Sequence, residues 1–368
     1  MPTVRTVTVK SASGDYTSLA AAEAGEQADL VSLDRQLDIE CYASAAGDST
    51  QVTINGWTTD ATRYIRVVCP SGERHAGTWD AAKYHLSVTT SGSPGGCITV
   101  REDYTRVEYL QVRNLRGSPP EFNDCVYADG GVSVRFDSLI LRDGYRGFSF
   151  ETGGHVNSVA RNCVAYGNSR AGGLIRGTAA GSATADNCTL IGGLYGLEST
   201  ASAIYPIARN VYAHGSSQGF GASAGGVVAK TNCMSSDTTA TNNSGGGGAT
   251  NCTNSVAHNT TQFTNVTGGS ENYLLPSGSA LIDAGTDLSA TFTNDIDGTV
   301  RPQNSVYDVG ADERAAGGGG AVATFVVGGG AAGASGVIGA VLRRGREVVV
   351  LAVRRPPADR RWVVRGLR

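Results

Sequence analysis

The chain has 368 residues, of which 17% are charged and 51 are glycine, and its net charge at pH 7 is −3. Such a chain, rich in Gly, Ser, Thr and Asn with only short apolar runs, excludes helical repeats, because amphipathic helices need long periodic apolar faces. The charge is divided unevenly. Residues 1–313 hold 20 basic and 31 acidic residues, a net charge of −11, whereas residues 314–368 hold ten and two, a net charge of +8.

Residues 1–36 are expected to form a strand and a capping helix. Residues 3–10 alternate in the manner of a first strand, and Thr17 or Ser18 is suited to cap a helix over 19–33. Because a β-helix ends in unpaired strands, this helix is expected to cover the first coil. The chain starts without an apolar signal sequence, which predicts synthesis in the cytoplasm with reduced cysteines.

Residues 37–313 are predicted to form a parallel β-helix, a stack of coils of short parallel strands that ends in a C-terminal closing motif. Four cysteines, Cys41, Cys69, Cys97 and Cys125, recur every 28 residues, as expected for coils that stack like residues on like. No cysteine belongs to a CxxC pair, which argues against a structural zinc site. The expected early strands are 37–42, 52–57, 64–69, 84–90, 97–100, 106–112, 124–128 and 132–140.

A short phrase, Asn followed by Cys or Val, returns between residues 161 and 253 at intervals of 25, 23, 22 and 19 residues. A glycine before a large apolar residue keeps step with it, which indicates a structural repeat. Stacked coils are expected to place the asparagines in an amide ladder at a turn and the cysteines in an inward stack. The ladder comprises Asn162, Asn187, Asn210, Asn232 and Asn251, and the thiol stack comprises Cys163, Cys188, Cys233 and Cys252.

The repeat fades after Val256, and the residues that follow resemble a known family. Residues 280–285, 295–302 and 307–313 form an end pattern, and this pattern resembles the closing motif of many bacterial and phage right-handed parallel β-helix repeat proteins of the pectin-lyase-like superfamily. Two earlier stretches are similar to members encoded in phages and prophages. The residues that carry the resemblance are 14–19, 57–66, 280–285, 295–302 and 307–313. It covers residues 3–313 and implies an all-β, right-handed parallel β-helix, but no single activity, because the superfamily includes lyases, hydrolases, tailspikes and inert virion parts.

One charged group near the end of the solenoid allows two interpretations. It comprises Asp295, Asp297, Arg301 and Asp308. Oxygen ligands from Asp295 and Asp297 would suit a calcium site. Alternatively the group is a C-terminal clamp, in which Arg301 forks to a carboxylate and closes the last coil. We favour the clamp, since the resemblance implies that this motif ends β-helices whatever their activity.

The tail is expected to be a Gly/Ala-rich linker over 314–336 and a basic β-meander over 337–368, with strands 337–342, 347–353 and 362–364. An alternative for 321–342 is a membrane span, which six glycines disfavour. The meander is expected to anchor the protein through Arg343, Arg344, Arg346, Arg354, Arg355 and Trp362. No nucleic-acid partner is expected, because the acidic body would repel a polyanion.

No catalytic residue, metal ligand or cofactor is assigned from the sequence. Carboxylates that adjacent coils could bring together for glycoside hydrolysis are Asp129, Asp137, Asp143, Glu151, Asp186 and Glu198. The resemblance favours a non-enzymatic phage virion protein, an exposed β-helix on a capsid, tail or spike. It would attach to other virion proteins through 337–368 and could form a homo-oligomer. The alternative is a tailspike-like β-helix that binds or cleaves host surface polysaccharide.

Overall fold

The computed structural model describes two units, which are treated separately here: residues 1–314 and residues 315–368. The described residues are 1–44, 46–90, 95–115, 123–151, 154–176, 183–200, 207–223, 228–242, 248–315, 337–344, 347–354 and 365–366.

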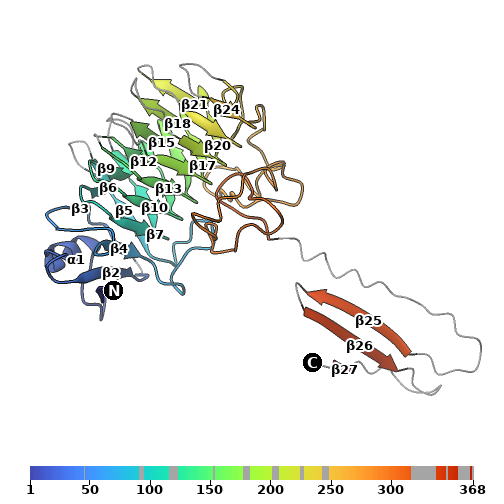
Figure 1. Ribbon diagram of the computed structural model, residues 1–368, viewed down its shortest axis with the longest axis horizontal. Coiled ribbons are helices and arrows are strands. Elements are labelled where there is room, and N and C mark those ends of the chain that lie inside the picture. Colours follow the sequence, from blue (N-terminus) through green and yellow to red (C-terminus); the bar gives the residue numbers. More distant parts are fainter. Residues whose placement is uncertain are drawn as a thin grey trace, which may run out of the picture. The chain divides into compact units, whose positions relative to one another are not determined.

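The first unit is a parallel β-solenoid of about seven turns, built from three sheets (Figure 1). Sheet I contains β1 (Thr3–Val9), β2 (Arg35–Cys41), β4 (Ile65–Val68), β7 (Arg106–Glu108), β10 (Arg135–Asp137), β13 (Val159–Arg161), β16 (Thr184–Asp186), β19 (Ile207–Arg209), β22 (Ala229–Thr231) and β24 (Ala249–Thr250). Sheet II contains β5 (His85–Val88), β8 (Gln111–Asn114), β11 (Ile140–Arg142), β14 (Val164–Asn168), β17 (Thr189–Gly192), β20 (Tyr212–Gly215) and β23 (Met234–Ser235). Sheet III contains β3 (Val52–Ile54), β6 (Gly95–Val100), β9 (Asn123–Ala128), β12 (Arg146–Phe150), β15 (Ala171–Arg176), β18 (Tyr195–Thr200) and β21 (Gln218–Ser223). Strands pair in parallel with their equivalents one coil away, which confirms the predicted β-solenoid.

A coil turns sharply between sheet I and sheet II at one residue with a left-handed backbone. Tyr109 (φ 61°) and Ser138 (φ 54°) occupy this position in two early coils, and asparagines occupy it in the later ones. The predicted single strands 106–112 and 132–140 were therefore wrong. Each is divided into two strands of different sheets by a residue in the left-handed region, which a continuous strand does not contain.

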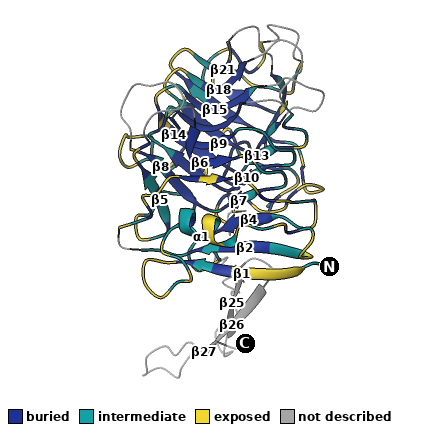
Figure 2. Cartoon of the chain, turned by 90° about the vertical axis from the view of Figure 1, so that its left-hand side faces the viewer, coloured by how far each residue is buried: buried dark blue, intermediate teal, exposed yellow. Residues whose placement is uncertain are grey.

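The inside of the solenoid is a continuous apolar core (Figure 2). On sheet I the inward positions of successive coils include Val67, Val107, Phe136, Ala160 and Ala185, none of which is exposed. Rings stack within this core, since the centroids of Phe136 and Phe150 are 5.2 Å apart. Burial of such side chains contributes roughly 1.5–3 kcal/mol each.

The N-terminal helix, α1 (Leu19–Glu26), is shorter than expected. It begins as predicted, with the Ser18 hydroxyl accepting a hydrogen bond from the Ala21 amide, and it buries Leu19 and Ala22 in the core. The predicted continuation to residue 33 was wrong. Asp29 accepts a hydrogen bond from the Ser32 amide and fixes a turn there instead.

Residues 256–314, which we call the flank segment, lie along the side of the solenoid. The outer face of sheet II is apolar, and the flank segment covers it to form a second core. The residues from sheet II are Ile140, Val164, Tyr166, Ile191, Tyr212 and Met234, and those from the flank segment include Val256, Phe263, Tyr273, Leu275, Leu281, Ile296 and Val309. The flank segment contains isolated β-bridges instead of named strands, yet its apolar side chains cover the outer face of sheet II from β11 to β23.

The second unit contains an antiparallel hairpin of β25 (Val337–Arg344) and β26 (Glu347–Arg354), with β27 (Arg365–Gly366) pairing to β26. The first two strands of the predicted meander correspond to β25 and β26, and the third predicted strand, 362–364, lies outside the described residues. Among the described residues no helix is both long and apolar enough to cross a bilayer, and residues 321–336 lie outside them.

Candidate functional site

Charged side chains project from the outer face of sheet I in register. The last residues of five consecutive strands lie side by side, and from the second onward their charges alternate. In coil order these residues are Glu108, Asp137, Arg161, Asp186 and Arg209. Arg161 pairs with Asp137 at 2.6 Å, and Arg209 pairs with Asp186 at 2.6 Å. Coil stacking thus brings acids and arginines from distant parts of the sequence within one strand spacing, about 4.8 Å.

A pocket of about 320 Å³ opens where this face meets the flank segment. Its wall contains four arginines and two carboxylates, so its formal charge is positive within an acidic body. The lining residues are Arg66, Arg74, Glu108, Tyr109, Arg135, Asp137, Arg161, Asn162, Phe292, Thr293 and Asn294. A cationic pocket of this size is suited to a small anionic group or one unit of an acidic polymer.

Three of the four arginines in the pocket are held by carboxylates. Arg66 donates to Glu108 at 2.8 Å, Arg135 also donates to Glu108, and Arg161 donates to Asp137. Burial opposes the ionisation of Glu108, but the charges of Arg135 and Arg66 outweigh it and lower the pKa of this carboxyl. Glu108 therefore stays ionised and holds the two guanidinium groups in place.

Arg74 differs, because it pairs with no carboxylate among the described residues. Its Nε donates to the carbonyl of Cys69 at 3.1 Å, and its guanidinium lies over the ring of Tyr109, 3.6 Å from the centroid. A cation that is oriented by stacking and has no anionic partner is available to a ligand.

Two polar atoms of the lining residues are buried without a hydrogen-bond partner. One is Nε of Arg135, which lies 3.9 Å from the nearest Asp137 oxygen, and the other is Oδ1 of Asn162. Asn162 is only 2% exposed, and its amide nitrogen is used by the carbonyl of Asn294 at 2.8 Å. The pocket thus has an unused donor and an unused acceptor, each of which is costly in a buried position.

The predicted asparagine ladder occupies the left-handed turn of five coils, with φ between 47° and 54°. The side chains do not form an uninterrupted amide ladder, because most of them hold the flank segment. Asn187 donates to the carbonyls of Asp308 and Gly310, Asn232 donates to that of Ala284, and Asn210 both donates to and accepts from Thr286. Within the ladder, Asn210 donates to Asn187 at 3.0 Å. Asn tolerates this backbone conformation and leaves its amide free for a neighbour.

The eight cysteines are free thiols. Cys163, Cys188 and Cys233 are fully buried and point into the core, and their thiols donate to backbone carbonyls of their own or the preceding coil. Cys252, in the last coil, is half-buried.

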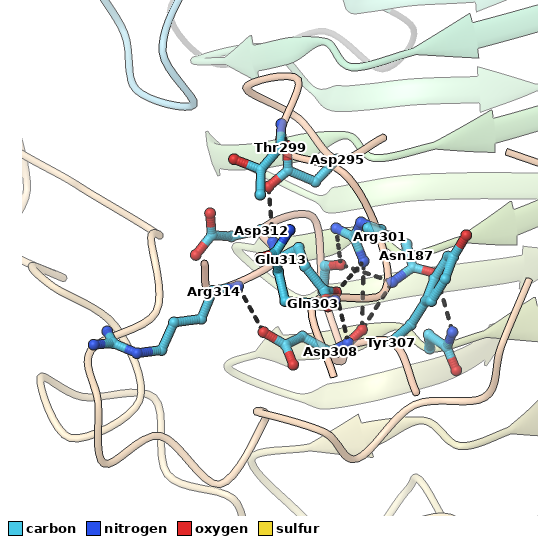
Figure 3. Close-up of polar contacts among 12 residues, drawn as sticks. Asn187, Asp295, Thr299, Arg301, Gln303, Tyr307, Asp308, Asp312, Glu313 and Arg314 are labelled. Atoms are coloured by element: carbon cyan, nitrogen blue, oxygen red, sulfur yellow. Dashed lines mark hydrogen bonds and ion pairs between the residues drawn. The ribbon is translucent and has the colours of Figure 1, made fainter. Parts of the chain in front are cut away.

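Three of the four residues of the predicted C-terminal clamp, Asp295, Arg301 and Asp308, lie together in the flank segment (Figure 3). Arg301 is fully buried, and it donates to the carbonyls of Gly310 and Ala311. Its ion-pair partner is Glu313, at 3.7 Å, which the sequence analysis did not single out. The expectation that Arg301 closes the last coil was wrong, because the clamp lies on the side of the solenoid, where Asp308 contacts Asn187.

Asp295 and Asp297 approach each other and Asp312, with ligand atoms within 4.8 Å. The carboxylate of Asp295 already accepts from the backbone amides of Asp297, Gly298 and Thr299 and from that of Glu313. Burial raises the pKa of Asp295 to about 8. These contacts describe a carboxyl that braces its own loop.

The six candidate carboxylates are each paired with an arginine. Glu151 and Glu198 converge on Arg146, at 3.0 and 3.4 Å, on the outer side of sheet III. Asp124, which the sequence analysis missed inside an apolar strand, also lies 3.8 Å from Arg146, and burial raises its pKa to about 7. The other pairs are Asp129 with Arg101, Asp137 with Arg161, Asp143 with Arg113 and Asp186 with Arg209.

Two histidines that are distant in sequence stack on each other. The rings of His214, in β20, and His258, in the flank segment, have centroids 4.3 Å apart, and the Tyr273 ring also stacks on His258, with centroids 5.9 Å apart. Nε2 of His258 is buried without a partner. Burial, with a smaller effect of His214, lowers the pKa of His258 to about 4.

Acidification is therefore expected to loosen the flank segment. The folded protein holds His258 neutral, so its contribution is complete above the unfolded pKa of about 6.5 and is lost as the pH falls through about 4. After allowance for partial exposure we expect a loss of about 1–2 kcal/mol between pH 7 and pH 4. Urea unfolding of the unmodified chain and of His258→Phe at pH 7 and pH 4 measures this loss of stability. An equal pH effect in both proteins would contradict the assignment.

Of the predicted anchor residues, Arg343 and Arg344 lie in β25 and Arg354 lies in β26. Arg346, Arg355 and Trp362 lie outside the described residues.

No protein-family model matches the chain, and neither curated proteins nor solved structures show a significant match to it.

Proposed function

We propose that the protein is a non-enzymatic, glycan-binding β-solenoid, whose pocket on sheet I holds an acidic unit of a polysaccharide. The observation that carries the proposal is the cationic pocket in which Arg74 has no carboxylate partner among the described residues. An acidic sugar combines an anionic group for the guanidinium of Arg74 with hydroxyls that can donate and accept hydrogen bonds.

The pairing of the carboxylates supports binding rather than catalysis. A glycosidase of the common kind needs one protonated carboxyl as acid and a second carboxylate as base or nucleophile. In this pocket Glu108 accepts from two arginines, and its pKa is lowered, which makes it a poor proton donor. Asp137 is held by Arg161 through two guanidinium nitrogens. Both acids are occupied in orienting arginines.

The resemblance to phage and prophage β-helix proteins suggests where such binding would be used. In this extension of the proposal the protein is a virion component, attached to other virion proteins through residues 337–368, and the solenoid meets a host surface polysaccharide. The separation of the C-terminal hairpin from the solenoid as its own unit favours an attachment role. Mass spectrometry of purified phage particles tests this extension. Absence of the protein from the particles would refute the virion role but would leave the glycan-binding proposal unaffected.

Substituting Arg74 tests the binding proposal. Arg74→Gln is expected to weaken the affinity for an acidic polysaccharide by about tenfold or more, because a hydrogen bond to a charged group contributes roughly 1.5–3 kcal/mol. Titration calorimetry with a uronic-acid polymer and with a neutral glucan measures it. Arg101→Gln, which changes an exposed ion pair with Asp129 elsewhere on the solenoid, is the control. Equal binding of the two polymers, or unchanged affinity in Arg74→Gln, would refute the proposal.

A further inference from the structure

The cysteines of the last two coils lie directly opposite each other. β22 and β24 pair in register, with Thr231 opposite Thr250, and the register continues, because the Thr253 amide donates to the carbonyl of Cys233 at 3.0 Å. Cys233 and Cys252 are therefore neighbours across one strand spacing of about 4.8 Å. This spacing lies within the range of Cα separations, roughly 4.4–6.8 Å, that a disulfide bridges.

The two thiols have different environments. Cys252 is half-buried, its sulfur accepts a hydrogen bond from the Cys233 amide at 3.4 Å, and its thiol donates to the carbonyl of Thr250 at 3.4 Å. The contact with Cys233, with a smaller effect of the charge of Lys230, lowers the pKa of Cys252 to about 7, although burial opposes this. Burial and the contact with Cys252 raise the pKa of Cys233. A thiolate that reaches solvent thus lies beside a protonated thiol.

Lys230 is an unusual residue for its position. It lies on the inward side of sheet I, where the preceding coils have alanines, and it is only 5% exposed. Its ammonium group is fixed by the carbonyls of Val228 and Asn242 at 3.1 and 3.0 Å. A buried cation costs free energy unless it is compensated by hydrogen bonds or nearby negative charge, and thiolate character at Cys252 provides such charge.

We propose that Cys252 and Cys233 form an oxidation-sensitive thiol pair that closes to a disulfide when the protein meets a hydroperoxide. The Cys252 thiolate attacks one peroxide oxygen, so that an S–O bond forms, the O–O bond breaks, and the departing hydroxide takes up a proton to leave as water. The Cys233 sulfur then attacks the Cys252 sulfur. The S–S bond forms, the S–O bond breaks, and hydroxide leaves with the Cys233 proton as a second water. The two sulfurs lose two electrons, and the peroxide oxygens gain them.

The chain contains a matched internal control. Cys163 and Cys188 repeat the same Asn-Cys phrase on neighbouring coils, and β13 and β16 also pair in register. Both thiols are fully buried, and burial raises the pKa of Cys188. If stacking alone led to oxidation, this pair would react as well. If exposure and the Lys230 environment are required, it stays reduced.

Peptide mapping tests the proposal on the full chain. The protein is treated with hydrogen peroxide at pH 7, quenched with N-ethylmaleimide and digested without reductant. We expect a linked peptide pair that contains Cys233 and Cys252, and we expect Cys163 and Cys188 to be recovered as thiols. Cys233→Ser is expected to leave a sulfenic acid on Cys252 that dimedone traps. Oxidation of the interior pair at the same rate, or no reaction at Cys252, would overturn the proposal.

A second measurement does not depend on a variant. The rate at which iodoacetamide alkylates Cys252 in the unmodified chain should rise with a midpoint near pH 7. Lys230→Gln should lower the rate at pH 7, by at most about fifteenfold if the pKa returned fully to its free value of about 8.5. A midpoint at the free-thiol value would overturn the proposal even if Lys230→Gln failed to fold.

Discussion

Replacing Arg301 with methionine is expected to destabilise the flank segment by about 3–5 kcal/mol, the cost of removing one partner from a buried ion pair. The guanidinium has no exposed surface, and it supplies hydrogen bonds to the carbonyls of Gly310 and Ala311. Without it these carbonyls and the carboxylate of Glu313 lose their cationic partner in a place that water does not reach. The apolar replacement fills part of the volume but satisfies none of these groups.

Urea unfolding followed by tryptophan fluorescence, together with limited proteolysis of residues 256–314, measures this effect. Arg101→Met is the control, because the Arg101 side chain is 46% exposed and pairs with Asp129 at the surface. Exposed pairs contribute about 0–1 kcal/mol, so the control should change little. A loss in Arg301→Met no larger than in the control would show that the clamp does not hold the flank segment.

The second large effect is expected for Arg146→Met, also at about 3–5 kcal/mol. Arg146 lies among Asp124, Glu151 and Glu198, each of which is at most 3% exposed. Without Arg146, Glu198 keeps Arg170 and Glu151 keeps Arg176, but Asp124 has no arginine partner among the described residues and lies in a poorly solvated place. The pKa of Asp124, which burial already raises to about 7, should then rise further, so the variant should recover stability as the pH falls from 8 to 5, because protonation removes the uncompensated charge.

Comparing the urea midpoints of the unmodified chain and of Arg146→Met at pH 8 and pH 5 measures how much stability the variant loses and whether it regains stability at the lower pH. Arg176→Met is the matched control, because Arg176 also pairs with Glu151 but its side chain is 41% exposed. We expect a loss of at most about 1 kcal/mol there. A destabilisation of Arg146→Met that stays constant with pH would mean that lost packing, not unpaired charge, is its cause.

The repeat made the fold predictable, whereas the bends were harder to see. Asn at a fixed interval marks the left-handed turn because few other residues tolerate that backbone. In the early coils the same position holds Tyr109 and Ser138, which have no such compositional signature, and so the turns there were missed. The early cysteine spacing of 28 residues preserves the coil length but does not mark the bends within it.

The pocket could not be predicted, because its lining comes from separate strands and from the flank segment. Arg66, Arg135 and Arg161 lie on three different coils, and Asn294 reaches them only because the flank segment folds back along the solenoid. That return depends on the apolar outer face of sheet II. Its strands are short and buried on both faces, so they lack the alternation that would have identified an outward apolar side.

The charge alternation on sheet I restricts how this solenoid can change length. From Asp137 to Arg209 successive coils present acid, arginine, acid and arginine in one file. Tandem duplication of a single coil would place two like charges side by side in neighbouring strands, which is destabilising. Duplication of two adjacent coils keeps the order. Duplication of two adjacent coils within this stretch is therefore expected to be less destabilising than duplication of one.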